Sequence, residues 1–99
     1  MNAGDYVKAN TDRVDLLCQL AEEAAELSQA ALKVARKLKG TNPTPKSLIE
    51  CKMNLIEEVA DVELCLNLLG MFNPLAERRE LDIMNAKVER WAARIRRAK

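Results

Sequence analysis

Apolar residues recur at alternating intervals of three and four along three stretches of this chain, the spacing of helices that are buried along one side. The first stretch predicts a helix that begins at Thr11 or Asp12, either of which can cap it, and runs to about Leu38. Gly40 is positioned to stop that helix. The apolar positions of this predicted helix are Leu17, Leu20, Ala24, Leu27, Ala31, Val34 and Leu38.

Glycine and proline mark the limits of two further predicted helices. After a turn over residues 40–45, Thr44 can cap a second helix with Pro45 at its first position, and Gly70 ends it. Asn73, again followed by proline, caps a third helix that runs toward the C-terminus. The apolar positions are Leu55, Val59, Val62, Leu66 and Leu69 in the second helix, and Leu81, Met84, Val88, Trp91 and Ile95 in the third.

The composition is that of an all-α protein. Hydrophobic residues make up 48% of the 99 residues but aromatic ones only 3%, so the core must be built from aliphatic side chains. We predict a single domain, residues 1–99, in which an antiparallel helical hairpin is followed by a C-terminal helix. Residues 1–10 show no clear pattern, as expected of a loose N-terminal arm. Because small helical bundles often gain core by pairing, we expect a homodimer, or a dimer of dimers, with a four-helix-bundle core.

Charge and cysteine content argue against several classes of function. The net charge of +1 and the lack of interleaved aromatic residues speak against nucleic-acid binding. The longest apolar stretch, residues 64–72, is too short to span a membrane, and no signal peptide is visible, so we expect a soluble cytoplasmic protein. With no histidine and no CxxC spacing, neither a zinc site nor a disulfide framework is expected. We interpret Cys18, Cys51 and Cys65 as reduced core residues.

One eight-residue acidic pattern occurs twice, once in each of the first two predicted helices. Residues 20–27 read Leu-Ala-Glu-Glu-Ala-Ala-Glu-Leu, and residues 55–62 read Leu-Ile-Glu-Glu-Val-Ala-Asp-Val. Each copy places carboxylates three residues apart within an apolar helical pattern, so both lie on one side of their helix. Two such pairs, brought face to face, are what a divalent cation needs.

Helical geometry separates these carboxylates into inner and outer ones. At about 100° per residue, an inner carboxylate lies about 60° to 120° from the centre of its apolar stripe, and an outer one lies almost opposite the stripe. The inner residues are Glu23, Glu26, Glu58 and Asp61, and the outer ones are Glu22 and Glu57. In an antiparallel hairpin whose turn is centred near residue 42, Glu26 faces Glu58 and Glu23 faces Asp61, so the two pairs should meet.

Four carboxylates gathered beside a bundle core repel one another. Two unit charges about 4 Å apart cost about 4 kcal/mol at an effective dielectric of about 20, so protonation, neighbouring lysines or arginines, or bound cations must relieve the repulsion. An all-oxygen ligand set favours Mg²⁺, with Mn²⁺ as the alternative, over zinc. A ferritin-like di-iron site needs Glu-x-x-His, and this chain has no histidine. A solvated glutamate-rich surface is the competing interpretation.

A Glu-Glu-x-x-Glu helix, a turn and a Glu-Glu-x-x-Asp helix resemble the MazG-like family of all-α nucleoside triphosphate pyrophosphohydrolases. The resemblance covers about residues 14–95, and the segment Asn85-Ala-Lys-Val-Glu-Arg-Trp91 is similar to the lysine-containing third helix of that family. It implies hydrolysis of a nucleoside triphosphate to the monophosphate and pyrophosphate with Mg²⁺. The interval between the two motifs is rather long for the family, and no aromatic residue beside the first motif is placed to sandwich a base.

The resemblance also implies roles for individual residues. The metal ligands would be Glu23, Glu26, Glu58 and Asp61. One acid of the first motif, Glu22 or Glu23, would orient or deprotonate the attacking water. Such an assignment suits phosphoryl chemistry, which relies on positioning and charge neutralisation.

Further polar residues are candidates for contacts to the substrate. Lys87 lies at the edge of the third apolar stripe and is the candidate for a phosphate contact, with Arg90 and Arg94 on the same flank. The alternative for these three residues is a solvated basic face or pairing with acids on a neighbouring helix. Asn54 and Gln19 each lie one turn from an acid pair, where they can contact a sugar, a base or a ligand carboxylate. A plain surface role is the alternative for both.

Two other functions compete with hydrolysis. The heptad stripes on all three predicted helices are also those of a non-catalytic helical interaction or regulatory module. The basic C-terminal segment suggests RNA or DNA binding, although the near-zero net charge counts against it.

Overall fold

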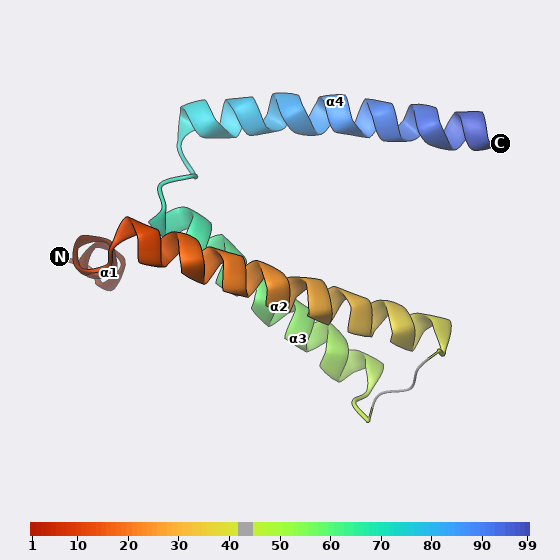
Figure 1. Cartoon of the computed structure of the whole chain (residues 1–99), viewed down its shortest axis with the longest axis horizontal. Coiled ribbons are helices and arrows are strands. Elements are labelled where there is room, and N and C mark those ends of the chain that lie inside the picture. Colours follow the sequence, from red (N-terminus) through yellow and green to blue (C-terminus); the bar gives the residue numbers. More distant parts are fainter. Residues whose placement is uncertain (42–44) are drawn as a thin grey trace. The chain divides into compact units, whose positions relative to one another are not determined.

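The computed structural model describes residues 1–41 and 45–99. This part of the chain contains helices and no strand, which confirms the predicted all-α fold (Figure 1). The helices are α1 (Ala3–Asn10), α2 (Arg13–Lys39), α3 (Leu48–Leu68) and α4 (Pro74–Ala98). None of them is long and apolar enough to cross a membrane.

Helix α2 begins and ends where the sequence predicts. The Asp12 side chain accepts a hydrogen bond of 3.1 Å from the backbone N–H of Val14, so Asp12 is the cap. At the other end Gly40 adopts a left-handed φ of 73°, and its N–H donates to the carbonyl of Lys37. A residue with a side chain would be strained at that φ, which explains the glycine.

Helix α3 begins later than predicted. Its cap is Ser47, whose hydroxyl accepts a hydrogen bond of 3.1 Å from the backbone N–H of Glu50. Pro45 is therefore not the first helical residue, and the proposed cap Thr44 lies outside the described residues. The Ser-x-x-Glu spacing that starts at Ser47 is a capping signal in its own right. At the C-terminal end, Gly70 has a φ of 76° and follows the last turn of α3, as expected.

Residues 3–10 form a helix instead of a loose arm. The Asn2 side chain caps α1 by accepting a hydrogen bond of 2.8 Å from the backbone N–H of Asp5, and the acid itself suits the first turn of a helix. Helix α1 contacts α3, although none of its residues is buried. Asn2 and Asp5 are the residues from which this helix could have been predicted, because the segment has no strong apolar periodicity.

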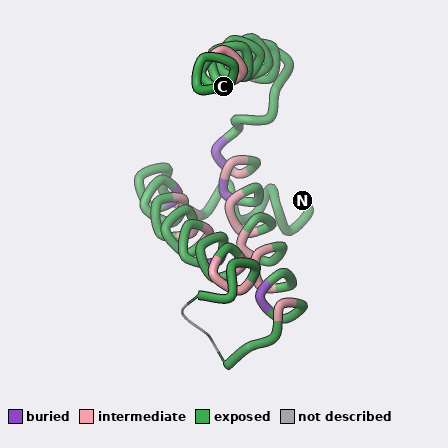
Figure 2. The backbone as a smooth tube through the Cα atoms, turned by 90° about the vertical axis from the view of Figure 1, so that its right-hand side faces the viewer, coloured by how far each residue is buried: buried purple, intermediate pink, exposed green. Residues whose placement is uncertain are grey.

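Helices α2 and α3 lie side by side and antiparallel, and their contact forms the core of the hairpin (Figures 1 and 2). Figure 2 shows buried and half-buried positions along the sides on which the two helices face each other. The contact line follows heptad spacing on both helices. Its members are Leu16, Leu20, Glu23, Leu27, Ala30 and Val34 on α2, and Cys51, Leu55, Glu58, Val62, Cys65 and Leu69 on α3.

The contact line of α2 differs from the predicted stripe by about one residue. Leu17 and Leu38, both predicted to be core, are 49% and 65% exposed, and Leu16 is buried instead. The reason is that α2 is apolar on two neighbouring sides and α3 covers only one of them. Cys18 lies off the contact line and is exposed, so its interpretation as a core residue was wrong.

Residue contacts divide the chain into two units, residues 1–69 and residues 70–99. The second unit consists mainly of α4, which Asn73 caps through a hydrogen bond of 2.9 Å from the N–H of Ala76, with Pro74 at the first position as predicted. No residue of α4 is buried. Its predicted apolar stripe is between 49% and 63% exposed; the members are Leu81, Met84, Val88, Trp91 and Ile95.

Candidate metal-binding site

Three of the four predicted metal ligands converge in the middle of the hairpin. One carboxylate oxygen from each of Glu23, Glu26 and Glu58 lies within 4.8 Å of the other two. Glu23 and Glu58 are half-buried, because each occupies a position in the contact line between α2 and α3, and Glu26 is exposed. The fourth residue, Asp61, is half-buried one turn after Glu58 but is not part of this group of three.

Two of the carboxylate oxygens are shielded from water without a protein partner. Oε2 of Glu23 and Oε2 of Glu58 are buried and accept no hydrogen bond from residues 1–41 and 45–99. A buried acceptor that has lost water and gained no donor destabilises the fold, by about 1–3 kcal/mol in typical cases and more if it is charged. A cation between the two oxygens would remove this penalty for both.

Gln19 holds one of the carboxylates in place. Its Nε2 donates a hydrogen bond of 2.8 Å to Oε1 of Glu23, one turn further along α2. The observed contact of Gln19 is therefore with the carboxylate of Glu23. This hydrogen bond engages Oε1 of Glu23 and leaves the buried Oε2 as the oxygen without a partner.

The electrostatics of the cluster favour a proton or another cation. Burial is the largest cause that raises the pKa of Glu58 above the usual 4.5, followed by the charge of Glu26, the charge of Asp61, a hydrogen bond with Glu26 and the charge of Glu23. Among the residues that the structure describes, no lysine or arginine is among the causes of this shift. The cluster therefore holds a proton to a higher pH than an isolated glutamate, and a divalent cation would compete with that proton.

Cys65 is a neighbour of the cluster that the sequence interpretation did not include. Burial raises the pKa of its thiol, and the charges of Glu23 and Asp61 raise it further. The signal was available in the sequence, because Cys65 follows Asp61 by one turn on the same side of α3. A neutral thiol at this position adds no charge beside the acidic cluster.

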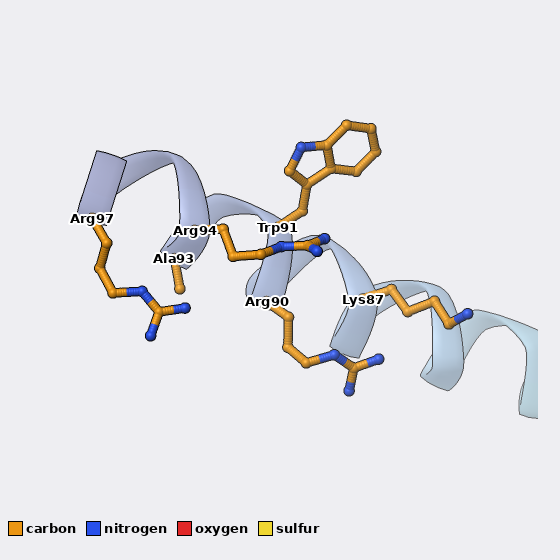
Figure 3. Close-up of a pocket in the computed structure, with 6 residues that line it drawn as sticks. All are labelled: Lys87, Arg90, Trp91, Ala93, Arg94 and Arg97. Atoms are coloured by element: carbon orange, nitrogen blue, oxygen red, sulfur yellow. The ribbon is translucent and has the colours of Figure 1, made fainter. Parts of the chain in front are cut away.

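The remaining predicted residues lie outside the cluster. Glu22 and Glu57 are exposed, as expected for outer carboxylates, and Asn54 is half-buried one turn before Glu58. Lys87 and Arg90 belong to the other unit, on α4. There they line a surface groove of about 490 Å³ (Figure 3), together with Trp91, Ala93, Arg94 and Arg97.

Figure 3 shows how the α4 side chains are arranged. The four long cationic side chains extend along the helix, and the indole of Trp91 projects away from it. The groove is therefore strongly basic, which suits it to an anionic ligand.

Comparisons of the chain with protein-family models, with curated proteins and with solved structures found no match.

Proposed function

We propose that this protein is a Mg²⁺-dependent nucleoside triphosphate pyrophosphohydrolase of the MazG-like kind, which converts a nucleoside triphosphate and water to the monophosphate and pyrophosphate. The observation that carries the proposal is the convergence of Glu23, Glu26 and Glu58, with two buried carboxylate oxygens that have no partner. The doubled acidic pattern in the sequence supports the same assignment.

The donor set suits Mg²⁺, and Mn²⁺ as a substitute. All donors are hard carboxylate oxygens, and Asp61 is near enough to influence the cluster as a fourth ligand or as an outer acceptor. Bound there, the metal would neutralise phosphate charge and coordinate phosphate oxygens. These residues would hold it, and the Gln19 hydrogen bond would keep Glu23 oriented toward it.

A carboxylate beside the cluster must also take up the proton of the attacking water. Glu22 and Glu23 remain the two candidates. Glu22 is exposed and available to a water molecule, whereas Glu23 is half-buried and already accepts a hydrogen bond from Gln19. The position of Glu23 in the cluster supports it as a metal ligand, and one of these two glutamates would orient or deprotonate the water. We assign Asn54, Lys87 and Arg90 to substrate binding.

We further propose that the protein acts in the cytoplasm as a homodimer, or a dimer of dimers, in which two hairpins form a four-helix bundle. The support is a second apolar stripe on α2, made of small and aliphatic residues with heptad spacing and exposed throughout. Its members are Val14, Leu17, Ala21, Ala24, Ala31, Ala35 and Leu38. A monomer would leave this stripe in water, whereas small residues let a second helix approach closely.

The experiment that tests the activity uses a panel of nucleoside triphosphates with Mg²⁺ and detects pyrophosphate and monophosphate. We expect at least one substrate to be cleaved, and Glu58→Gln to lose that activity because the variant removes a ligand charge. Glu57→Gln is the matched control, since Glu57 is the adjacent residue and is exposed. Inactivity across the whole panel, or full activity of Glu58→Gln, would refute the proposal.

A non-catalytic helical interaction module is the second candidate function. The exposed apolar stripe of α4 favours it, because a helix with Leu81, Val88 and Trp91 in water is suited to bind another helix. This alternative predicts that Mg²⁺ leaves the melting temperature unchanged.

A further inference from the structure

The face of α2 that carries the acidic cluster continues toward the turn and becomes basic. Residues three, four or seven apart share one side of a helix, so Glu26 lies on the same side as Ala30 and Lys33. Lys33 is exposed and follows Glu26 by two turns, about 10 Å along the helix axis. Ala30 lies between them, is only 2% exposed and has the smallest side chain that carries a Cβ. The chain therefore places a lysine two turns from the carboxylates on the same side of α2.

Helix α3 contributes the residues that lie opposite this side of α2. Because Glu26 lies beside Glu58 in an antiparallel pair, residues nearer the turn on α2 face residues earlier in α3. Asn54 is half-buried at the level of Ala30, and the buried Cys51 lies near the level of Lys33. From the cluster toward the turn, the polar groups thus change from carboxylate to amide to ammonium.

Toward the start of α2, the same side of the helix carries different polar groups. Going from Glu23 toward the start of α2, the same side carries Gln19 and then Asp15, which is exposed. The facing part of α3 carries Cys65 and Leu68, neither of which is cationic. A chain of phosphates that starts at the cluster is attracted toward Lys33 and repelled by Asp15, so only one direction along the hairpin suits it.

We propose that Lys33 binds the far end of the polyphosphate chain of the substrate. The pyrophosphate leaving group then points toward the turn between α2 and α3, Asn54 lies beside the middle of the chain, and the nucleoside points toward Gln19 and Cys65. The inference rests on the proposed function and names a substrate contact and an orientation that it leaves open. The ammonium of Lys33 has a flexible stem suited to a phosphate contact, and within the described residues it forms no hydrogen bond or ion pair.

The carboxylate of Glu50, which lies near the level of Lys33, forms no ion pair with it within the described residues. Glu50 lies on the neighbouring side of α3, but its carboxylate accepts a hydrogen bond of 3.3 Å from the hydroxyl of Ser47 within its own capping turn. This contact keeps Glu50 at the start of α3.

The test measures the binding of inorganic tripolyphosphate by calorimetry in the presence of Mg²⁺. The variants are Lys33→Gln, Lys39→Gln as the matched control, and Glu58→Gln. Lys39 has the same charge, is exposed near the same end of α2 and lies about 120° around the helix. We expect Lys33→Gln to weaken binding about tenfold, the effect of one hydrogen bond between charged groups. Lys39→Gln should stay within about twofold of the wild type, as expected for a surface charge away from the ligand.

A nucleoside monophosphate supplies a second readout, because a general loss of positive charge would weaken its binding, whereas the loss of a contact to the far phosphates would not. It lacks the far phosphates, so its Mg²⁺-dependent affinity should be the same in Lys33→Gln and in the wild type. Binding of tripolyphosphate that is lost in Glu58→Gln but unchanged in Lys33→Gln would overturn the Lys33 contact and leave the proposed function standing. A wild-type protein that binds no polyphosphate with Mg²⁺ would overturn both.

Discussion

Millimolar Mg²⁺ should raise the melting temperature of this protein, and the rise should depend on Glu58. Three carboxylate oxygens lie within 4.8 Å of one another, and two glutamate oxygens are buried without a partner. A cation that binds only the folded chain adds about 1.4 kcal/mol to the free energy of unfolding at about 10 mM if its Kd is about 1 mM. For a domain of this size that gain corresponds to a rise of about 6–11 °C.

The assay is a thermal melt in EDTA and in Mg²⁺ at matched ionic strength, which separates site binding from general screening. Glu58→Gln should lose most of the rise, whereas Glu57→Gln should keep it. In EDTA at neutral pH, Glu58→Gln should melt no lower than the wild type, because the substitution removes a charge that Glu26, Asp61 and Glu23 repel. An equal rise in both variants, or an equal rise with sodium alone, would refute the reasoning.

Four further predictions follow from the same residues. Since the pKa of Glu58 is raised above 4.5, the stabilising contribution of its protonated form is complete below 4.5 and is lost as pH rises through the folded pKa. Urea unfolding in EDTA should therefore show the stability of the wild type rising, relative to Glu58→Gln, as the pH is lowered from neutral toward 4.5. In thiol titration of the native protein, the exposed Cys18 should react quickly, and Cys51 and Cys65 only after unfolding. Light scattering should show that Ala24→Glu, on the second stripe of α2, dissociates the oligomer while Gln29→Glu does not. Glu58→Leu should raise the melting temperature in EDTA and abolish the response to Mg²⁺.

Much of the hairpin could be predicted because its ends are fixed by local chemistry. Asp12 and Gly40 at the ends of α2, and likewise Asn73 at the start of α4, act through short-range hydrogen bonds or backbone conformation, which the sequence alone specifies. The start of α3 was misplaced because two capping signals compete there, and a proline was preferred to the Ser-x-x-Glu pattern at Ser47. Helix α1 was missed because its signal lies in its cap and not in its periodicity.

The contact line of α2 could not be chosen from the sequence. Leu20, Leu27 and Val34 belong to two heptad stripes at once, one that runs through Leu16 and Ala30 and another that runs through Leu17 and Ala31. Both stripes are apolar, so periodicity cannot tell which one α3 covers. The choice depends on the tertiary contact, which covers the stripe with Leu16 and leaves Leu17 49% exposed.

Which stripe of α2 is covered by α3 changes how Glu23 and Glu58 are interpreted. On the predicted stripe Glu23 would lie at the edge of the contact, but on the observed one it occupies a contact position between Leu20 and Leu27, as Glu58 does between Leu55 and Val62. A hairpin shaped only for stability would place apolar residues at both positions, because each glutamate there loses solvation and repels the other. The small neighbours Ala30, Cys51 and Cys65 leave few contacts to compensate. Stability is thus lowered where the carboxylates meet, which is the pattern expected when a binding site and not the core determines the residues.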